Sequence, residues 1–100
     1  MEVQDFCTQM EKQLGTFKDS LSKIEKQLDA GGTESKQRIL AVVGDIKQLM
    51  TELSLQKERL EKECPSDWSD DKTRMEDLVG RIRSDIDRTW TELSLGDVGG

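Results

Sequence analysis

Residues 3–28, VQDFCTQMEKQLGTFKDSLSKIEKQL, carry an apolar side chain at alternating steps of three and four residues. One row consists of Val3, Met10, Phe17 and Ile24, and the other of Cys7, Leu14, Leu21 and Leu28. Both rows fall on one face of an α-helix, because residues three and four apart are neighbours on a helix surface. The stretch therefore predicts a long amphipathic helix that packs against other helices.

Two short breaks divide the chain into three stretches of similar length. Residues 30–32 (AGG) are a strong helix stop, and Thr33 directly after them is a good N-cap. Pro65 ends the second stretch, because the residue before a proline is disfavoured in the α region. Ser66 or Ser69 can then cap the third helix. The breaks predict helices over residues 2–29, 34–63 and 67–95.

The second and third stretches continue the apolar pattern of the first. Their apolar positions are Ile39, Val42, Val43, Ile46, Leu49, Met50, Leu53, Leu60, Met75, Leu78, Val79, Ile82, Ile86, Trp90 and Leu93. When the chain is folded back on its two breaks, Phe17, Ile46 and Ile86 share a central layer. The sequence thus predicts an all-α fold, an antiparallel up-down-up three-helix bundle with coiled-coil-like heptad packing. One domain would cover residues 1–95, with a flexible tail at 96–100.

A long self-associating coiled coil is the alternative architecture. Parallel dimers prefer β-branched residues at the heptad position a and leucine at position d. Residues 3–28 show the reverse, because the leucine row occupies a and the row of Val3, Met10, Phe17 and Ile24 occupies d. The nearly equal spacing of the two breaks also favours hairpins. Heptads nevertheless allow self-association of such hairpins.

Composition excludes several classes of partner. The chain has 15 basic and 21 acidic residues and a net charge of −6, so no basic track for nucleic acid or an anionic membrane is expected. No apolar run approaches the length of a membrane span, and no signal-peptide core is evident. Antiparallel pairing of the first two predicted helices places Cys7 level with Gln56. Gln56 lies about 12 Å along the helix axis from Cys64, which is farther than a disulfide can span. Free thiols and an intracellular, cytoplasmic location are expected.

The sequence offers little for catalysis or metal binding. Histidine is absent, so the commonest general base and zinc ligand are missing, and Cys7 has no base to activate it. Residues 67–71 open like a calcium loop, but Lys72 stands where glycine is needed and Leu78 where a bidentate glutamate is needed. We expect no catalytic residues, no metal and no cofactor.

Hydrophobic residues outside the packed layers are the candidates for partner binding. Phe6 and Leu78 lie toward the same end as Trp68, and we expect all three along a groove between the first and third helices. Further candidates are Leu40, Met50 and Leu55. A charged residue at Phe6 or Leu78 should then leave the monomer folded and abolish partner capture. Two alternatives involve no partner. One is that the hydrophobic residues are scattered singly over the surface, and the other is that Trp68, in its acidic turn (66–71), only closes the bundle end.

Arg81 and Arg83 complete the set of candidate partner-binding residues. Their spacing predicts intrahelical pairs between Arg81 and Asp85 and between Arg83 and Asp87 on a solvated face. A dedicated anion site is the alternative.

Three glycines lie inside the predicted helices, where each costs about 1 kcal/mol relative to alanine. They are Gly15, Gly44 and Gly80. Close approach of two helices and a groove for another chain are the two explanations.

The length and the three-helix pattern resemble known interaction modules. These are the N-terminal regulatory bundles of SNARE proteins, spectrin-type repeats and the bundle of co-chaperones that bind the Hsp70 ATPase. Residues 78–83 (LVGRIR) are similar to an apolar-basic run in the last helix of the co-chaperone bundle, although Met75 stands where that bundle has a basic residue. Residues 7–22 and 44–53 resemble the N-terminal helices of a spindle and kinetochore-associated coiled-coil subunit.

These observations predict a non-enzymatic protein–protein interaction domain, an adaptor, scaffold or assembly domain of an intracellular coiled-coil-type protein. Its partner would be another protein that binds through a helix, or a second copy of the chain. The alternative is a structural element that co-assembles with partner helices in a multi-subunit, cytoskeletal or spindle complex.

Overall fold

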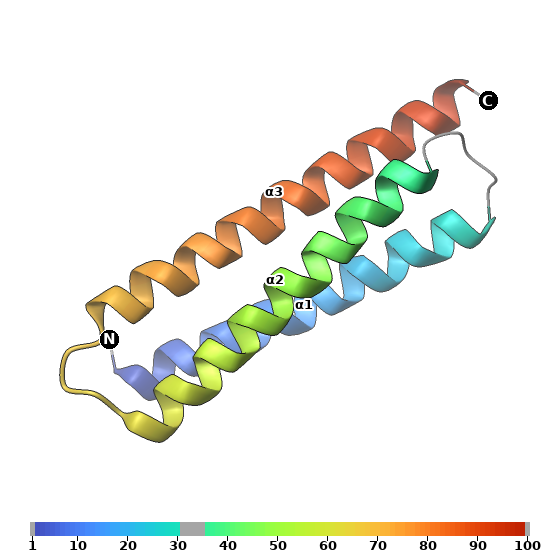
Figure 1. The fold of residues 1–100 in the computed structure, drawn as a ribbon. Coiled ribbons are helices and arrows are strands. Elements are labelled where there is room, and N and C mark those ends of the chain that lie inside the picture. Colours follow the sequence, from blue (N-terminus) through green and yellow to red (C-terminus); the bar gives the residue numbers. More distant parts are fainter. Residues whose placement is uncertain (1, 31–35, 100) are drawn as a thin grey trace.

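Three long helices, packed side by side, make up most of the described part of the chain (Figure 1). The computed structural model describes residues 2–30 and 36–99. The helices are α1 (Val3–Ala30), α2 (Lys36–Glu63) and α3 (Ser69–Gly99). Because α2 runs antiparallel to both α1 and α3, the predicted all-α, up-down-up bundle is confirmed. The molecule is a rod of 54 × 18 × 18 Å, and the described residues contain no strand.

A single hydrophobic core runs along the axis of the rod. Both apolar rows of α1 are buried, apart from Val3, which is partly buried. Val42 and Trp90, expected inside the core, are also only partly buried and pack against its edge. The side chains with no accessible surface are Ile24, Ile46, Leu53, Met75 and Ile82. The core therefore draws on all three helices, as the layer pattern predicts.

The core is wider than the two heptad rows. Phe6, Met50 and Leu78 were expected outside the packed layers, yet only 2%, 8% and 6% of their surfaces are exposed. The expectation that they are surface hydrophobes is therefore wrong. Each helix of a three-helix bundle contacts two neighbours, so it buries a broader stripe than the two-row seam of a coiled-coil pair.

A buried lysine ties α1 to α2 near one end of the bundle. Lys57 is 9% exposed, and its ammonium lies 3.5 Å from the Glu11 carboxylate and 3.4 Å from the Glu61 carboxylate. Burial disfavours the charged ammonium, but the charges and hydrogen bonds of Glu61 and Glu11 outweigh it and raise the pKa of Lys57. The Cys7 thiol donates to the Lys57 carbonyl oxygen at 3.8 Å, one residue from the predicted level at Gln56.

The turn between α2 and α3 is capped differently from the expectation. Asp67, and not Ser66 or Ser69, supplies the cap: its Oδ1 accepts the Ser69 backbone N–H at 3.3 Å and the Ser69 hydroxyl at 2.6 Å. A carboxylate suits this position, because it satisfies free donors at the positive end of the helix. These hydrogen bonds lower the pKa of Asp67. The Trp68 carbonyl then accepts the first helical bond, from the Lys72 N–H at 2.9 Å.

Cys64 ends α2 in a left-handed conformation, with a φ of 41°. Its N–H donates to the Leu60 carbonyl at 3.0 Å, as in helix ends that usually carry glycine. A side chain costs about 1–2 kcal/mol in this region of φ and ψ, so we expect Cys64→Gly to be more stable than Cys64→Ala by about 1 kcal/mol. Urea denaturation of the two variants measures the difference. An alanine variant as stable as the glycine variant would contradict the proposed strain.

The helix ends differ in part from the sequence prediction. α3 continues to Gly99, beyond the end expected near Leu95, because one glycine weakens a helix without blocking its hydrogen bonds. α2 is described from Lys36, and the expected N-cap Thr33 lies outside the described residues.

The three glycines inside the helices face open space. A Cβ atom added at Gly15, Gly44 or Gly80 would meet nothing within 4 Å. Close approach of two helices within the chain is therefore not the reason for these glycines. A groove for another chain remains the open explanation.

Candidate partner-binding site

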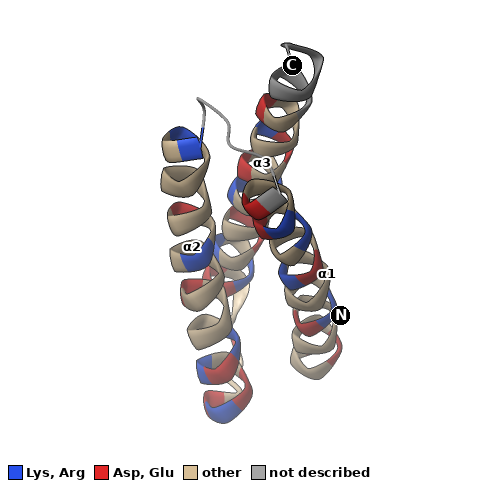
Figure 2. Cartoon of the chain, turned by 90° about the vertical axis from the view of Figure 1, so that its right-hand side faces the viewer, with Lys and Arg blue, Asp and Glu red and all other residues tan. Residues whose placement is uncertain are grey.

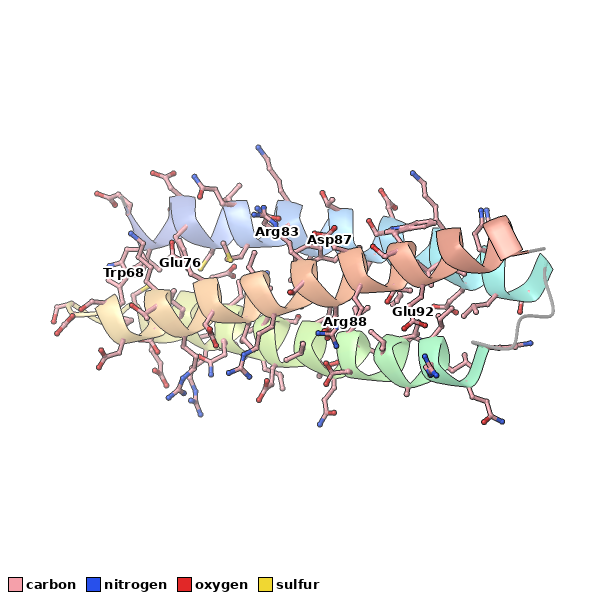
Figure 3. The ribbon with its side chains drawn as sticks, turned by 90° about the horizontal axis from the view of Figure 1, so that it is seen from above. Trp68, Glu76, Arg83, Asp87, Arg88 and Glu92 are labelled. Carbon is pink, nitrogen blue, oxygen red and sulfur yellow. The ribbon has the colours of Figure 1, made fainter. Side chains whose placement is uncertain are left out.

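The five residues predicted to bind a partner do not form one surface. Phe6 and Leu78 belong to the core, and Arg81 is exposed on α3. Trp68 is partly buried at one end of the bundle, and Arg83 is exposed on α3 (Figure 3). Phe6 lines a groove between α1 and α3 and Leu78 a separate groove between α2 and α3, and neither lining contains an exposed large hydrophobic side chain. The candidate surface has to be sought elsewhere.

Trp68 closes the end of the bundle where the chain begins. Its ring lies 5.3 Å from the ring of Phe6, at an interplanar angle of 53°, a favourable tilted arrangement. Trp68 thereby covers Phe6 and joins the α2–α3 turn to α1. The interpretation of Trp68 as a packing residue at the bundle end is confirmed.

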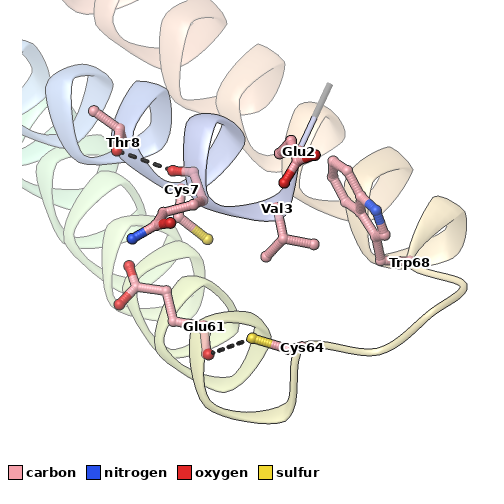
Figure 4. Close-up of a pocket in the computed structure, with 8 residues that line it drawn as sticks. Glu2, Val3, Cys7, Thr8, Glu61, Cys64 and Trp68 are labelled. Atoms are coloured by element: carbon pink, nitrogen blue, oxygen red, sulfur yellow. Dashed lines mark hydrogen bonds between the residues drawn. The ribbon is translucent and has the colours of Figure 1, made fainter.

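A hollow of ≈ 700 Å³ lies beside Trp68, between the start of α1 and the end of α2 (Figure 4). Both cysteines line it. Cys7 is buried and Cys64 is exposed, and both are free thiols. The Cys64 thiol donates to the Glu61 carbonyl at 3.1 Å.

Thiol chemistry is not favoured at Cys7. Burial, followed by the negative charge of Glu61, raises the pKa of Cys7. A raised pKa keeps the thiol protonated, whereas the thiolate is the nucleophile and the metal ligand. The hollow therefore holds no activated cysteine at Cys7.

Arg81 is paired within α3, but not with the expected carboxylate. Its Nε lies 3.1 Å from Oδ2 of Asp77, and both side chains are well exposed. The predicted pair with Asp85 is therefore wrong, because Asp85 turns toward α2 and faces Asp45 there. An exposed pair of this kind contributes little to stability.

Arg83 points from α3 toward α1, on the same side as Asp87 (Figure 3). No ion pair joins Arg83 and Asp87 in the described part of the chain, although their spacing predicted one. Arg83 instead lines a shallow groove of ≈ 320 Å³ between α1 and α3, with Glu76 in the same lining. The two charges are opposite, so this groove has no net preference for an ionic partner.

Two carboxyl groups meet between α2 and α3. Asp85 faces Asp45, and in the ionised form of Asp85 its buried Oδ2 has no hydrogen-bond donor, whereas protonated Asp85 can donate to Asp45. Burial, together with the hydrogen bond and charge of Asp45, raises the pKa of Asp85 to about 6, against the opposing charge of Arg88. The neighbouring Asp45 and the burial thus both disfavour the ionised form of Asp85. The pair therefore gives the bundle a pH-sensitive contact.

A groove of ≈ 480 Å³ lies between α1 and α2, farther along the rod than the hollow beside Trp68. The grooves described between α1 and α3 and between α2 and α3 are smaller, at ≈ 320 Å³ and ≈ 300 Å³. We call the first of these three the α1–α2 groove. Its lining consists of Leu14, Lys18, Leu21, Lys47, Met50, Thr51, Ser54 and Leu55. Leu55 is 61% exposed, the most exposed large hydrophobic side chain among the residues described.

The sequence contains a partial signal for this groove. Met50 and Leu55 are among the predicted partner-binding candidates, whereas the sequence pattern places Leu14 and Leu21 in the core alone. Lys18 and Lys47 were not singled out. Lys18 directly follows Phe17 of the apolar row. Coiled coils place the charges that select a partner at positions next to the apolar rows, so the spacing alone marks Lys18 as a candidate.

Basic and acidic residues are interspersed along all three helices (Figure 2). In the described ranges, no group of three or more His, Cys, Asp or Glu side chains is arranged to hold a metal ion. None of the described helices is both long and apolar enough to cross a membrane. Comparison of the chain with protein-family models, with curated proteins and with solved structures finds no match.

Proposed function

We propose that this chain is a non-enzymatic protein–protein interaction domain that binds a helix of another protein. The observation that carries the proposal is the α1–α2 groove, in which Leu14, Leu21 and Met50 form an apolar floor beside the exposed Leu55. An open apolar groove between two long helices can accept the apolar face of a third, in the helix-in-groove mode of recognition. We propose that the domain acts as an adaptor or assembly domain of an intracellular coiled-coil-type protein, and this mode of recognition is compatible with such a role.

The proposal is tested by recovering partners with two matched leucine variants. Leu55 lies in the groove, whereas Leu40 lies on the same helix outside it and is 48% exposed. Because both side chains are exposed, Leu55→Glu and Leu40→Glu should melt like the parent. We expect Leu55→Glu to lose the proteins that co-purify with the parent chain from cells, and Leu40→Glu to retain them. Identical recovery by both variants and the parent would overturn the proposal.

A structural element that co-assembles with partner helices is the second candidate. The slender shape of the rod favours it, because a cross-section of 18 × 18 Å leaves room for only a thin core. Sedimentation and circular dichroism over a concentration series separate the two candidates. A helical monomer at every concentration supports the interaction domain, and helicity that falls on dilution supports co-assembly.

A further inference from the structure

We infer that the partner helix of the α1–α2 groove is acidic: an amphipathic helix of another protein whose apolar stripe is flanked by glutamate or aspartate. The inference rests on the proposed function, since it names the chemistry of the partner for the same groove. It follows from the charges at the groove and from the length of its apolar floor.

The charge of the α1–α2 groove differs from that of the other two grooves. Its lining contains Lys18 from α1 and Lys47 from α2 and no acidic residue. The α1–α3 groove combines Glu76 with Arg83. The α2–α3 groove combines two acidic with two basic side chains, namely Glu52, Asp77, Arg74 and Arg81. In a chain of net charge −6, the groove with the most exposed leucine of the described residues is thus lined by two lysines and by no acidic side chain.

Both lysines can bind an incoming carboxylate. Lys18 and Lys47 are exposed, and they come from the two helices that form the walls of the groove. Lys47 lies 3.6 Å from the Glu25 carboxylate, but both side chains are about half exposed. A pair of this kind is weak, so a partner carboxylate can compete for the ammonium group.

The floor of the groove suits about two turns of helix. Leu14 and Leu21 are seven residues apart on α1, which corresponds to about 10 Å along the axis. A partner with apolar residues at i, i+4 and i+7 would cover this length, with acidic residues on both sides of the stripe to meet the two lysines.

The test uses two synthetic amphipathic helices of 18 residues that share the same leucine stripe. One carries glutamate and the other lysine beside the stripe. Binding to the intact chain is measured by fluorescence anisotropy at about 150 mM salt, where the overall charge of the chain is largely screened. We expect the glutamate peptide to bind about tenfold more tightly than the lysine peptide.

Two double variants of equal net charge show whether the two lysines at the groove cause the preference for the glutamate peptide. Lys18→Glu/Lys47→Glu should abolish the preference, whereas Lys23→Glu/Arg74→Glu, at exposed positions outside this groove, should keep it. Equal binding of the two peptides to the parent, or equal loss of preference in both variants, would overturn the inference and leave the groove as a helix-binding site. Binding of neither peptide, with unchanged partner recovery by Leu55→Glu, would overturn the proposed function as well. Displacement of both peptides by unlabelled chain would show that a second copy occupies the groove and would overturn the inference.

Discussion

Phe6→Ala is expected to lower the free energy of unfolding by about 3–5 kcal/mol, a large part of the stability of a domain of this size. Phe6 is 2% exposed, and its ring packs against Trp68 at 5.3 Å. Truncation removes buried aromatic surface and leaves a cavity beneath Trp68. The α2–α3 turn also loses its contact with α1, so the surrounding side chains can fill the cavity only in part. Urea denaturation monitored by circular dichroism measures the change.

The control for Phe6 is Leu55→Ala. Because Leu55 is 61% exposed, its truncation should change the stability of the isolated chain by less than about 0.5 kcal/mol. If Phe6→Ala melts like the parent, the assignment of Phe6 to the core is wrong. A charged residue at Phe6 should unfold the bundle, so a loss of partner binding in such a variant would not identify a binding surface.

Asp85→Asn is expected to raise the free energy of unfolding at pH 7 by about 1–2 kcal/mol. The pKa of Asp85 lies at about 6 in the folded chain, compared with an ordinary value of 3.8. At pH 7 the folded state therefore carries an ionised, partly buried carboxylate beside Asp45. Asparagine has nearly the same shape, carries no charge and can donate a hydrogen bond to Asp45. The magnitude allows for solvent screening, since Asp45 is exposed.

The raised pKa of Asp85 determines how the free energy of unfolding changes with pH. The folded state binds the Asp85 proton more tightly than the unfolded state does. The stability that this proton contributes is fully present below about pH 4 and is lost as the pH rises through about 6. Urea denaturation of the parent and of Asp85→Asn between pH 4 and 7.5 should give curves that diverge as the pH rises.

Asp87→Asn is the matched control, because Asp87 is exposed on the same helix. Its pH curve should run parallel to that of the parent. Asp45→Asn should reduce the pH dependence in part, since it removes the neighbouring charge but leaves Asp85 buried to the same extent. Parallel curves for the parent and Asp85→Asn would contradict the unfavourable contact between the two carboxyl groups.

The candidate site has moved from the one the sequence favoured. The sequence placed the partner surface between the first and third helices, at Phe6 and Leu78, and the structure buries both side chains. The proposed surface lies instead between α1 and α2, where Leu55 is exposed and Lys18 and Lys47 border an apolar floor. Partner-binding variants should accordingly be made at exposed positions such as Leu55, where loss of binding and loss of folding can be separated.

The sequence by itself determined the three helices, their antiparallel order and most of the core. Apolar spacing defines which face of a helix is buried, and the helix-stopping residues 30–32 and Pro65 indicate where the first two helices end. Both kinds of information are local, so they can be read along the chain without knowledge of the neighbouring helices.

Only the tertiary structure decided which side chains at the edge of the apolar face are covered. Phe6 and Leu55 are both hydrophobic residues beside an apolar row, yet the first is covered by Trp68 and the second remains exposed. Likewise Arg81 pairs with Asp77 because Asp85 turns toward Asp45 on another helix. Periodicity defines the apolar face within one helix, but the side from which each neighbour approaches depends on how all three helices pack together.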